Sequence, residues 1–220
     1  KQTDDEAAAK RDAEGAQQDA QKRREPGSAE LVKLAMRNFD SGEVDDAIEQ
    51  LRRSAASPSP ARAQTEKLLR QMERFQKAFR KGERQLANRD GRAAAKELES
   101  AYAVALEISE ESEHTEQARV ELAKAHYLAG NSAFEANPRE IRRARWHYRR
   151  VMALDPNSQA GVYSQRMIGE VDQRTERAFS DAQAHSDPDE RQRRLRAVLE
   201  MAEPGSTLFR RAQELLGTSD

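Results

Sequence analysis

The sequence predicts an all-α protein built from antiparallel helical hairpins. Apolar residues recur at steps of three and four along most of the chain, which is the period of an amphipathic helix. These stretches are interrupted at glycine and proline, for example at Gly42, Pro58 and Pro188, where we expect the chain to turn. Strand signals are missing from the sequence, because β-branched residues are scarce and no alternation of apolar and polar residues persists.

The composition favours an extended array of helices over a large globular core. The chain has 220 residues, enough for one extended domain or two small ones. Only 36% of its residues are hydrophobic and 5% are aromatic, while 35% are charged. A helical solenoid needs only thin apolar seams, because each helix contacts its neighbours alone. We therefore expect the hairpins to form an extended solenoid.

The first predicted helix pair is joined by a glycine turn within Ser41 to Leu51. The break at 25–28 precedes it and supplies Ser28 as a residue suited to cap a helix. Ala47 is a small residue that lets two antiparallel helices approach, and Leu51 is large enough to fill the gap above it. The apolar positions of the preceding helix are Leu31, Leu34 and Ala35.

These positions resemble a tetratricopeptide repeat over Ser28 to Ser54. A looser match runs from Ala125 to Asn157, and a degenerate one follows Asp90. The residues that carry the looser match are Tyr127, Gly130, Phe134, Ala144, Tyr148, Val151 and the proline exit at Pro156. The resemblance covers about a third of the chain and implies stacked helix pairs that bind other proteins.

The other helices follow from apolar spacing, and some are longer than the repeat family uses. A long helix is expected over 61–88, with a return partner over 92–108. An acidic loop at 110–115 precedes the next helix, which ends at 137–138. The next helix is expected to have Ile141 on its apolar face, and later helices are expected to follow the breaks at 157–158, 187–188 and 204–205.

The domain organisation is predicted as a leader followed by one helical-repeat domain. The leader, 1–27, is charged and rich in Ala, so it is either a solvated helix or flexible segment, or a helix that docks on the repeats. The repeat domain, 28–220, divides into sub-modules 28–110 and 115–220. Because the chain begins with Lys1, we expect it to be a processed or excised part of a longer protein.

The sequence favours a protein without catalytic activity, cofactor or metal. Its histidines are dispersed, and none forms a pair at the spacing of a zinc site. Each one is expected to be an ordinary surface or core histidine. Carboxylates alternate with arginines along helix faces, which is typical of solvated ion pairs. No glycine-rich phosphate loop or nucleophile elbow is present in the sequence.

Charge and hydropathy exclude several classes of partner. A net charge of −1 argues against nucleic acid or an anionic membrane surface as the main partner. No apolar run is long enough to span a bilayer. The chain has no Cys, which removes disulfides but leaves the compartment open between cytoplasm and periplasm. A protein or peptide partner, or self-association, remains.

One candidate binding site is a basic and aromatic patch. Arg142, Arg149 and Arg150 lie about one helical turn from Trp146. Their guanidinium groups are placed to stack on the indole and face an acidic or phosphorylated partner. The alternative is that Trp146 fills a contact with an adjacent helix while the arginines stay in water.

A second candidate follows from the resemblance to tetratricopeptide repeats. In that family the first helix of each pair lines a concave groove, and its groove-facing positions fall here on Val32, Met36 and Phe39. The resemblance implies a site there for an apolar peptide or a partner helix. The alternative is that the leader or the following long helix covers these residues.

Two functions are consistent with the sequence. The first is a protein interaction scaffold or adaptor without chemistry of its own, in which a rigid array of helices presents a preformed surface. The second is a structural spacer or oligomerisation segment of a larger bacterial envelope or secretion assembly. An adaptor exposes its groove, whereas an assembly segment buries its apolar strips against copies of itself.

Overall fold

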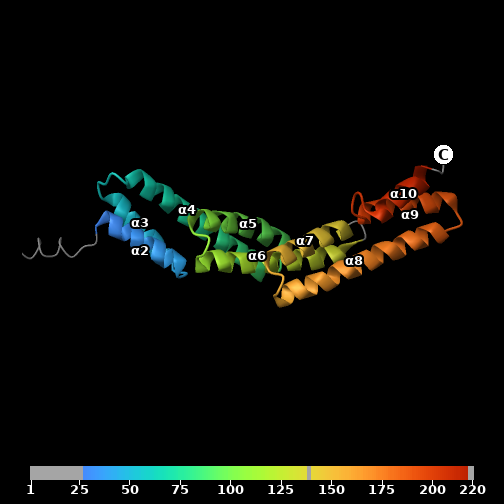
Figure 1. Ribbon diagram of the computed structural model, residues 1–220, viewed down its shortest axis with the longest axis horizontal. Coiled ribbons are helices and arrows are strands. Elements are labelled where there is room, and N and C mark those ends of the chain that lie inside the picture. The colour runs from blue at the N-terminus through green and yellow to red at the C-terminus, as the bar shows by residue number, and fades with distance from the viewer. Residues whose placement is uncertain (1–26, 138–139, 218–220) are drawn as a thin grey trace, which may run out of the picture. The chain divides into compact units, whose positions relative to one another are not determined.

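The fold is all-α, as predicted, and neighbouring helices pack against one another (Figure 1). The structure is a computed structural model that describes residues 27–137 and 140–217. Within these ranges it has nine helices and no strand. They are α2 (Ser28–Asp40), α3 (Val44–Ala56), α4 (Arg62–Ala87), α5 (Gly91–Ile108), α6 (Glu113–Ala136), α7 (Ile141–Leu154), α8 (Gln159–Ala184), α9 (Pro188–Met201) and α10 (Thr207–Gly217). Apart from Gly27, the predicted leader 1–27 lies outside the described residues.

The chain divides into two compact units. Among the described residues, unit 1 comprises 27–73 and 112–114, and unit 2 comprises 74–111, 115–137 and 140–217. The boundary falls inside α4, because that single long helix supplies side chains to both cores. Residues 74–110, which were predicted to belong to the first sub-module, belong to unit 2.

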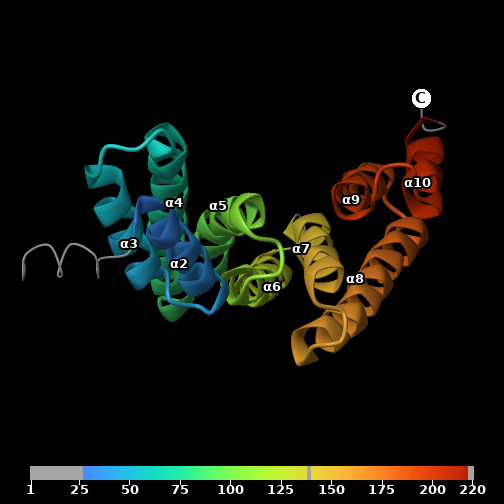
Figure 2. The ribbon, with the colours of Figure 1, turned by 60° about the vertical axis from the view of Figure 1, so that its left-hand side comes forward.

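Unit 1 is built around the helix pair α2 and α3, which lie side by side in Figures 1 and 2. Gly42 allows the sharp turn between them, because its φ of 82° is in the left-handed region that other residues avoid. Ala47 and Leu51 are fully buried at the crossing. Ser28 opens α2 instead of preceding it, and its hydroxyl lies 2.7 Å from that of Ser54 on α3.

Unit 2 begins with the second half of α4, followed by α5 and α6. Lys81 on α4 pairs with Glu97 on α5 at 2.7 Å. The apolar cluster of these helices contains Ala94, Ala95, Leu98, Leu122 and Ala125, with Phe79, Leu86 and Tyr102 packed against it. The predicted acidic loop is shorter than expected, since α6 already includes His114 and Thr115.

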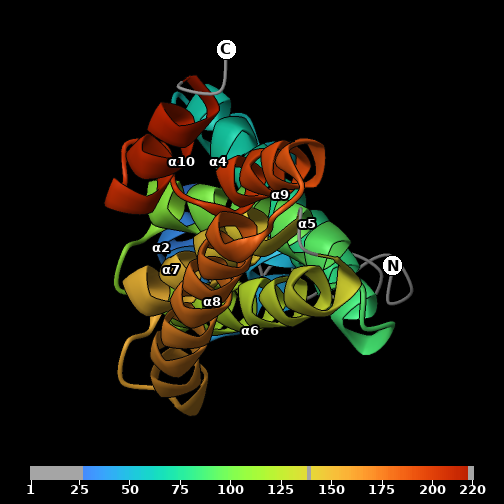
Figure 3. The ribbon, with the colours of Figure 1, turned by 90° about the vertical axis from the view of Figure 1, so that its right-hand side faces the viewer.

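The rest of unit 2 consists of α7 to α10, each packed on its predecessor (Figures 1 and 3). The cluster at α7 joins Ala133 of α6 with Val171 of α8 and Met201 of α9 around the fully buried Tyr148. A separate cluster of Phe179, Ala182, Leu195, Val198 and Ala212 joins α8, α9 and α10. No helix in the described part of the chain is long and apolar enough to cross a membrane.

Candidate functional site

Helix α7 has one buried apolar face and an unusual density of positive charge. Ile141, Ala144, Tyr148 and Val151 recur at helical spacing and are fully buried. The helix also carries five arginines and no acidic residue between Ile141 and Leu154. Trp146 projects from another face and stays 50% exposed. A half-exposed tryptophan on a basic helix is the largest aromatic surface that unit 2 presents to solvent.

Trp146 contacts two histidine rings, one from the neighbouring helix α6 and one from its own helix. Its ring centroid lies 5.4 Å from that of His126 on α6 and 4.8 Å from that of His147, its neighbour on α7. Both contacts are edge-on, with interplanar angles of 80° and 75°. Aromatic rings favour this arrangement, because the positive edge of one ring meets the negative face of the other. The indole is therefore fixed in place although half of it is in water.

The two histidines that contact the indole also contact each other. The Nδ1 atoms of His126 and His147 lie 3.0 Å apart, and both side chains are buried. One Nδ1 must donate and the other accept, so the pair is a hydrogen bond between two neutral rings of complementary tautomer. The sequence predicted surface or core histidines, and both of these lie in the core. Their spacing in the sequence did not indicate the contact between them, which packing of α6 on α7 creates.

Burial keeps this histidine pair neutral. The pKa of His126 is lowered to about 4, by burial first and then by the charges of His147 and Arg150. The pKa of His147 is also lowered to about 4, by burial first and then by the charges of Arg92 and Arg143. His126 Nε2 lies 3.5 Å from Glu99 Oε1 without the geometry of a hydrogen bond. At neutral pH the indole of Trp146 therefore contacts two uncharged histidine rings.

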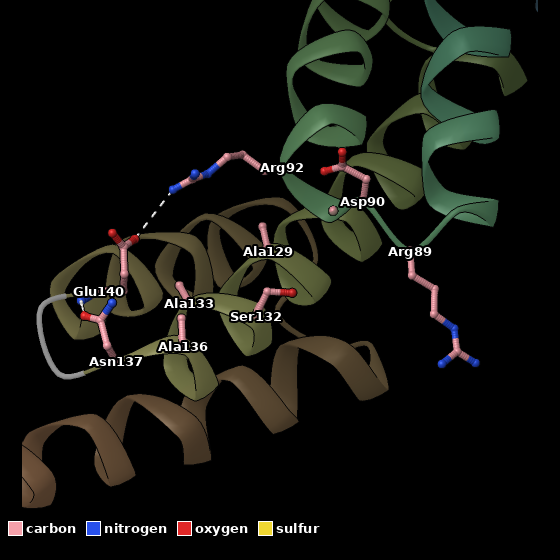
Figure 4. A pocket seen from close by; sticks show the side chains of 10 residues that line it. Arg89, Asp90, Arg92, Ala129, Ser132, Ala133, Ala136, Asn137 and Glu140 are labelled. Atoms are coloured by element: carbon pink, nitrogen blue, oxygen red, sulfur yellow. Dashed lines mark hydrogen bonds and ion pairs between the residues drawn. The ribbon is translucent and has the colours of Figure 1, made fainter.

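Next to Trp146 is an open hollow of about 510 Å³ with a positive lining. It is lined by Arg92, Glu140, Arg142, Arg143, Trp146 and His147, which we call the Trp146 surface. Glu140 is the one acidic residue among these six, and its carboxylate pairs with Arg143. The same carboxylate lies 3.5 Å from the Arg92 guanidinium of α5. Figure 4 marks this ion pair with a dashed line. Three arginines against one glutamate leave the lining with an excess of two positive charges.

A second hollow of about 540 Å³ adjoins the first and shares Arg92 and Glu140 with it. Its floor consists of small residues of α6, Ala129, Ser132, Ala133 and Ala136 (Figure 4). Arg89 also lines it but points away from the Arg92 and Glu140 pair. The excess positive charge that faces Trp146 therefore comes from α5 and α7, not from Arg89.

The structure assigns the predicted arginines of this patch to different contacts. Arg142 lines the hollow beside Trp146 and is exposed, as predicted. Arg149 forms an ion pair with Glu203, and Arg150 lies 3.8 Å from Glu99. The ring contacts of Trp146 are with histidines, not with guanidinium groups. The predicted stacking by Arg149 and Arg150 is therefore replaced by ion pairs to other helices.

Sequence reasoning missed Arg92 and Arg143 as residues of this surface. Arg92 is far from Trp146 in sequence, and its guanidinium group reaches the site beside Glu140, which precedes α7. Arg143 was available from the sequence, since it lies one turn before Trp146. Arg145 was missed as well: it is buried, pairs with Asp172 of α8 at 2.5 Å and donates to the Met201 carbonyl of α9.

The second predicted site, Val32, Met36 and Phe39, does not form a continuous open surface. Phe39 is fully buried, and its ring centroid lies 5.0 Å from that of His114. Val32 and Met36 are partly buried. The prediction that Phe39 faces a groove is wrong, because Phe39 lies on the same helical face as Leu31 and Ala35, which pack into the core of unit 1.

No protein-family model, curated protein or solved structure matches the chain. Its function must therefore be argued from its own residues. Over residues 27–137 and 140–217, no group of three or more His, Cys, Asp or Glu side chains is placed to hold a metal ion. The Trp146 surface places an aromatic ring beside guanidinium groups that outnumber the acids around them. Such an arrangement can offer stacking, apolar contact and charge-assisted hydrogen bonds.

Proposed function

We propose that this chain is a non-enzymatic scaffold that binds another protein, with its helices arranged as a tetratricopeptide-like solenoid. The observation that carries the proposal is Trp146, which is half exposed yet held edge-on by His126 and His147. Tryptophan and arginine are the residue types that most often dominate binding energy at protein interfaces. A side chain that is fixed before binding loses little conformational entropy when a partner covers it.

The Trp146 surface is a better binding site than the groove predicted on α2. Phe39, the largest of the three groove residues, contributes to the core of unit 1 and is not accessible. Trp146, in contrast, combines accessible aromatic area with unbalanced charge. The proposal therefore moves the principal contact from Val32, Met36 and Phe39 to Trp146 and its arginines.

The alternative function, a spacer or self-assembly segment, is favoured by a different feature. Val162 and Tyr163 are adjacent on α8 and are 61% and 45% exposed. Two exposed apolar neighbours on a helix suit a contact with another copy of the chain. The adaptor and the assembly segment thus predict different contact residues.

Photo-crosslinking tests the two functions directly. A benzophenone amino acid replaces Trp146 in one variant, Tyr163 in a second and Met36 in a third, each expressed in the cells of origin. We expect the Trp146 variant to crosslink to a different protein, identified by mass spectrometry, and the other two to do so weakly. Crosslinks from Tyr163 to peptides of this chain, with none from Trp146, would favour self-assembly and reject the adaptor.

A further inference from the structure

We propose that the Trp146 surface binds an acidic peptide segment of a partner protein, and that Glu140 occupies the carboxylate position until the partner displaces it. This inference rests on the proposed function, because it names the chemistry of the partner at the same site. It adds a specific residue whose removal is expected to strengthen binding.

Charge is the first reason for an acidic partner. Three of the six residues that line the hollow are arginines, and one acid opposes them. The other arginines of α7 are engaged elsewhere: Arg145 with Asp172 and Arg149 with Glu203. Arg142 is exposed and has no ion pair among the described residues. The lining of this hollow therefore has an excess of positive charge beside an exposed tryptophan, although the net charge of the chain is −1.

The contacts of Glu140 show how a carboxylate fits this site. Its carboxylate lies between Arg143 of α7 and Arg92 of α5, two guanidinium groups from helices that are distant in sequence. Guanidinium groups bind carboxylates through paired, charge-assisted hydrogen bonds. The longer contact, 3.5 Å to Arg92, is beyond good hydrogen-bond distance, and the Arg92 side chain is 64% exposed. An incoming carboxylate can therefore replace Glu140 at Arg92 without unfolding any helix.

Trp146 supplies the second half of the recognition. Its indole lies next to the arginines, so an apolar side chain that neighbours the partner's acidic residues would cover the exposed ring. Apolar contact adds affinity that salt does not screen, whereas the arginine contacts weaken as ionic strength rises. A nucleic acid would use the same arginines and stack bases on the indole, but it requires a wider positive field than a chain of net charge −1 provides.

A direct titration tests the proposal on the full chain. Trp146 is the only tryptophan, so its fluorescence reports binding at this surface without a label. The probe is a short synthetic peptide with Leu at its centre and Asp or Glu on both sides. We expect Glu140→Gln to bind this peptide about two- to fivefold more tightly than the parent, the range expected for one exposed charge pair. Arg142→Glu should weaken binding at least about fivefold.

Matched variants control for net charge. Glu176→Gln and Arg196→Glu make the same charge changes at exposed positions of α8 and α9, outside the hollow. Neither is expected to alter the affinity for the peptide. Arg92→Gln is a second loss-of-binding variant in case Arg142→Glu does not fold, and circular dichroism checks the fold of each variant.

Several results would overturn the inference. Unchanged or weaker peptide binding by Glu140→Gln would mean that Glu140 does not occupy the position of the partner's carboxylate. If Glu176→Gln and Arg196→Glu change the affinity as much as Glu140→Gln and Arg142→Glu do, only the net charge of the protein matters. Tighter binding of a single-stranded oligonucleotide than of the acidic peptide would assign the surface to nucleic acid. If the peptide does not bind but Trp146 still crosslinks to a protein, the scaffold function stands and its acidic partner is rejected.

Discussion

The ring of Tyr148 on α7 packs directly against the backbone of Gly130 on α6. A Cβ atom at Gly130 would lie 2.7 Å from Tyr148 Cε1 and 3.0 Å from Cδ1. Tyr148 cannot move away easily, because its ring is fully buried and its hydroxyl donates to Asn131 Oδ1 at 2.8 Å. The close approach of these two helices therefore depends on the missing side chain at Gly130.

We predict that Gly130→Ala destabilises the protein by about 1–2 kcal/mol. Overpacking of about 1–3 kcal/mol outweighs the gain of up to about 1 kcal/mol from the better helix propensity of Ala. Gly169→Ala on α8 is the matched control, since a Cβ there meets nothing within 4 Å. It should stabilise the protein. Urea denaturation of both variants measures the difference, and equal shifts in the same direction would contradict the packing.

We predict that the stability of unit 2 falls as pH drops from about 6.5 toward 4. The pKa of His126 and that of His147 are both lowered to about 4, so the unfolded chain binds protons in this window that the folded chain excludes. Their contribution is complete above pH 6.5 and is lost as pH falls toward 4. Each excluded proton adds a slope of up to about 1.4 kcal/mol per pH unit.

The groups around the histidine pair set the direction of this effect. Arg150 lowers the pKa of His126, and Arg92 and Arg143 lower that of His147. Glu99, whose Oε1 lies 3.5 Å from His126 Nε2, has the opposite charge. Urea titrations at a series of pH values, followed by Trp146 fluorescence, measure the slope. His147→Gln should flatten it. A parent protein whose stability is constant between pH 4 and 6.5 would show that the two rings are not buried together.

We predict that Arg89→Gly raises the stability of the protein by up to about 1 kcal/mol. Arg89 lies in the turn between α4 and α5 with a φ of 60°, a left-handed conformation that glycine adopts at lower cost. Its N–H donates to the Leu86 carbonyl and that of Asp90 donates to the Gln85 carbonyl, which holds the turn in place. Thermal melts measure the gain. Arg84→Gly, inside the same helix, should lower stability, and a loss in both variants would refute the proposed strain.

We predict that two arginines of α7 contribute unequally to stability. Arg145 is buried and Arg149 is 53% exposed, although each pairs with an acid of a following segment. Arg145→Ala removes a buried charged hydrogen bond and its packing, at a cost of about 1.5–3 kcal/mol. Arg149→Ala should cost less than about 1 kcal/mol, because water screens its pair with Glu203. The reverse order in denaturant unfolding would refute the burial of Arg145.

Part of the candidate site was predictable from local sequence, and part was not. Trp146 and Arg142 share a helix, so the spacing of one turn brings them to one surface. Arg143 has the same relationship and was within reach of the same reasoning. Arg92 and His126 belong to other helices, and nothing in the spacing of α7 indicates them. The local sequence also does not indicate that Arg149 and Arg150 lie beside Glu203 and Glu99. For this reason the prediction that they stack on the indole was wrong.

The sequence by itself determined the helices, because helical hydrogen bonds are local and the apolar face recurs with the helical period. A helix predicted over 61–88 is Arg62–Ala87 in the structure, and Pro188 begins α9 at the expected break. Only the tertiary structure decided which faces meet. It buried Phe39 against His114, paired His126 with His147 and placed Glu140 between Arg92 and Arg143. These contacts depend on how whole helices cross. The crossing is set by side-chain packing between helices that are distant in sequence, and the apolar period of one helix does not indicate which other helix it packs against.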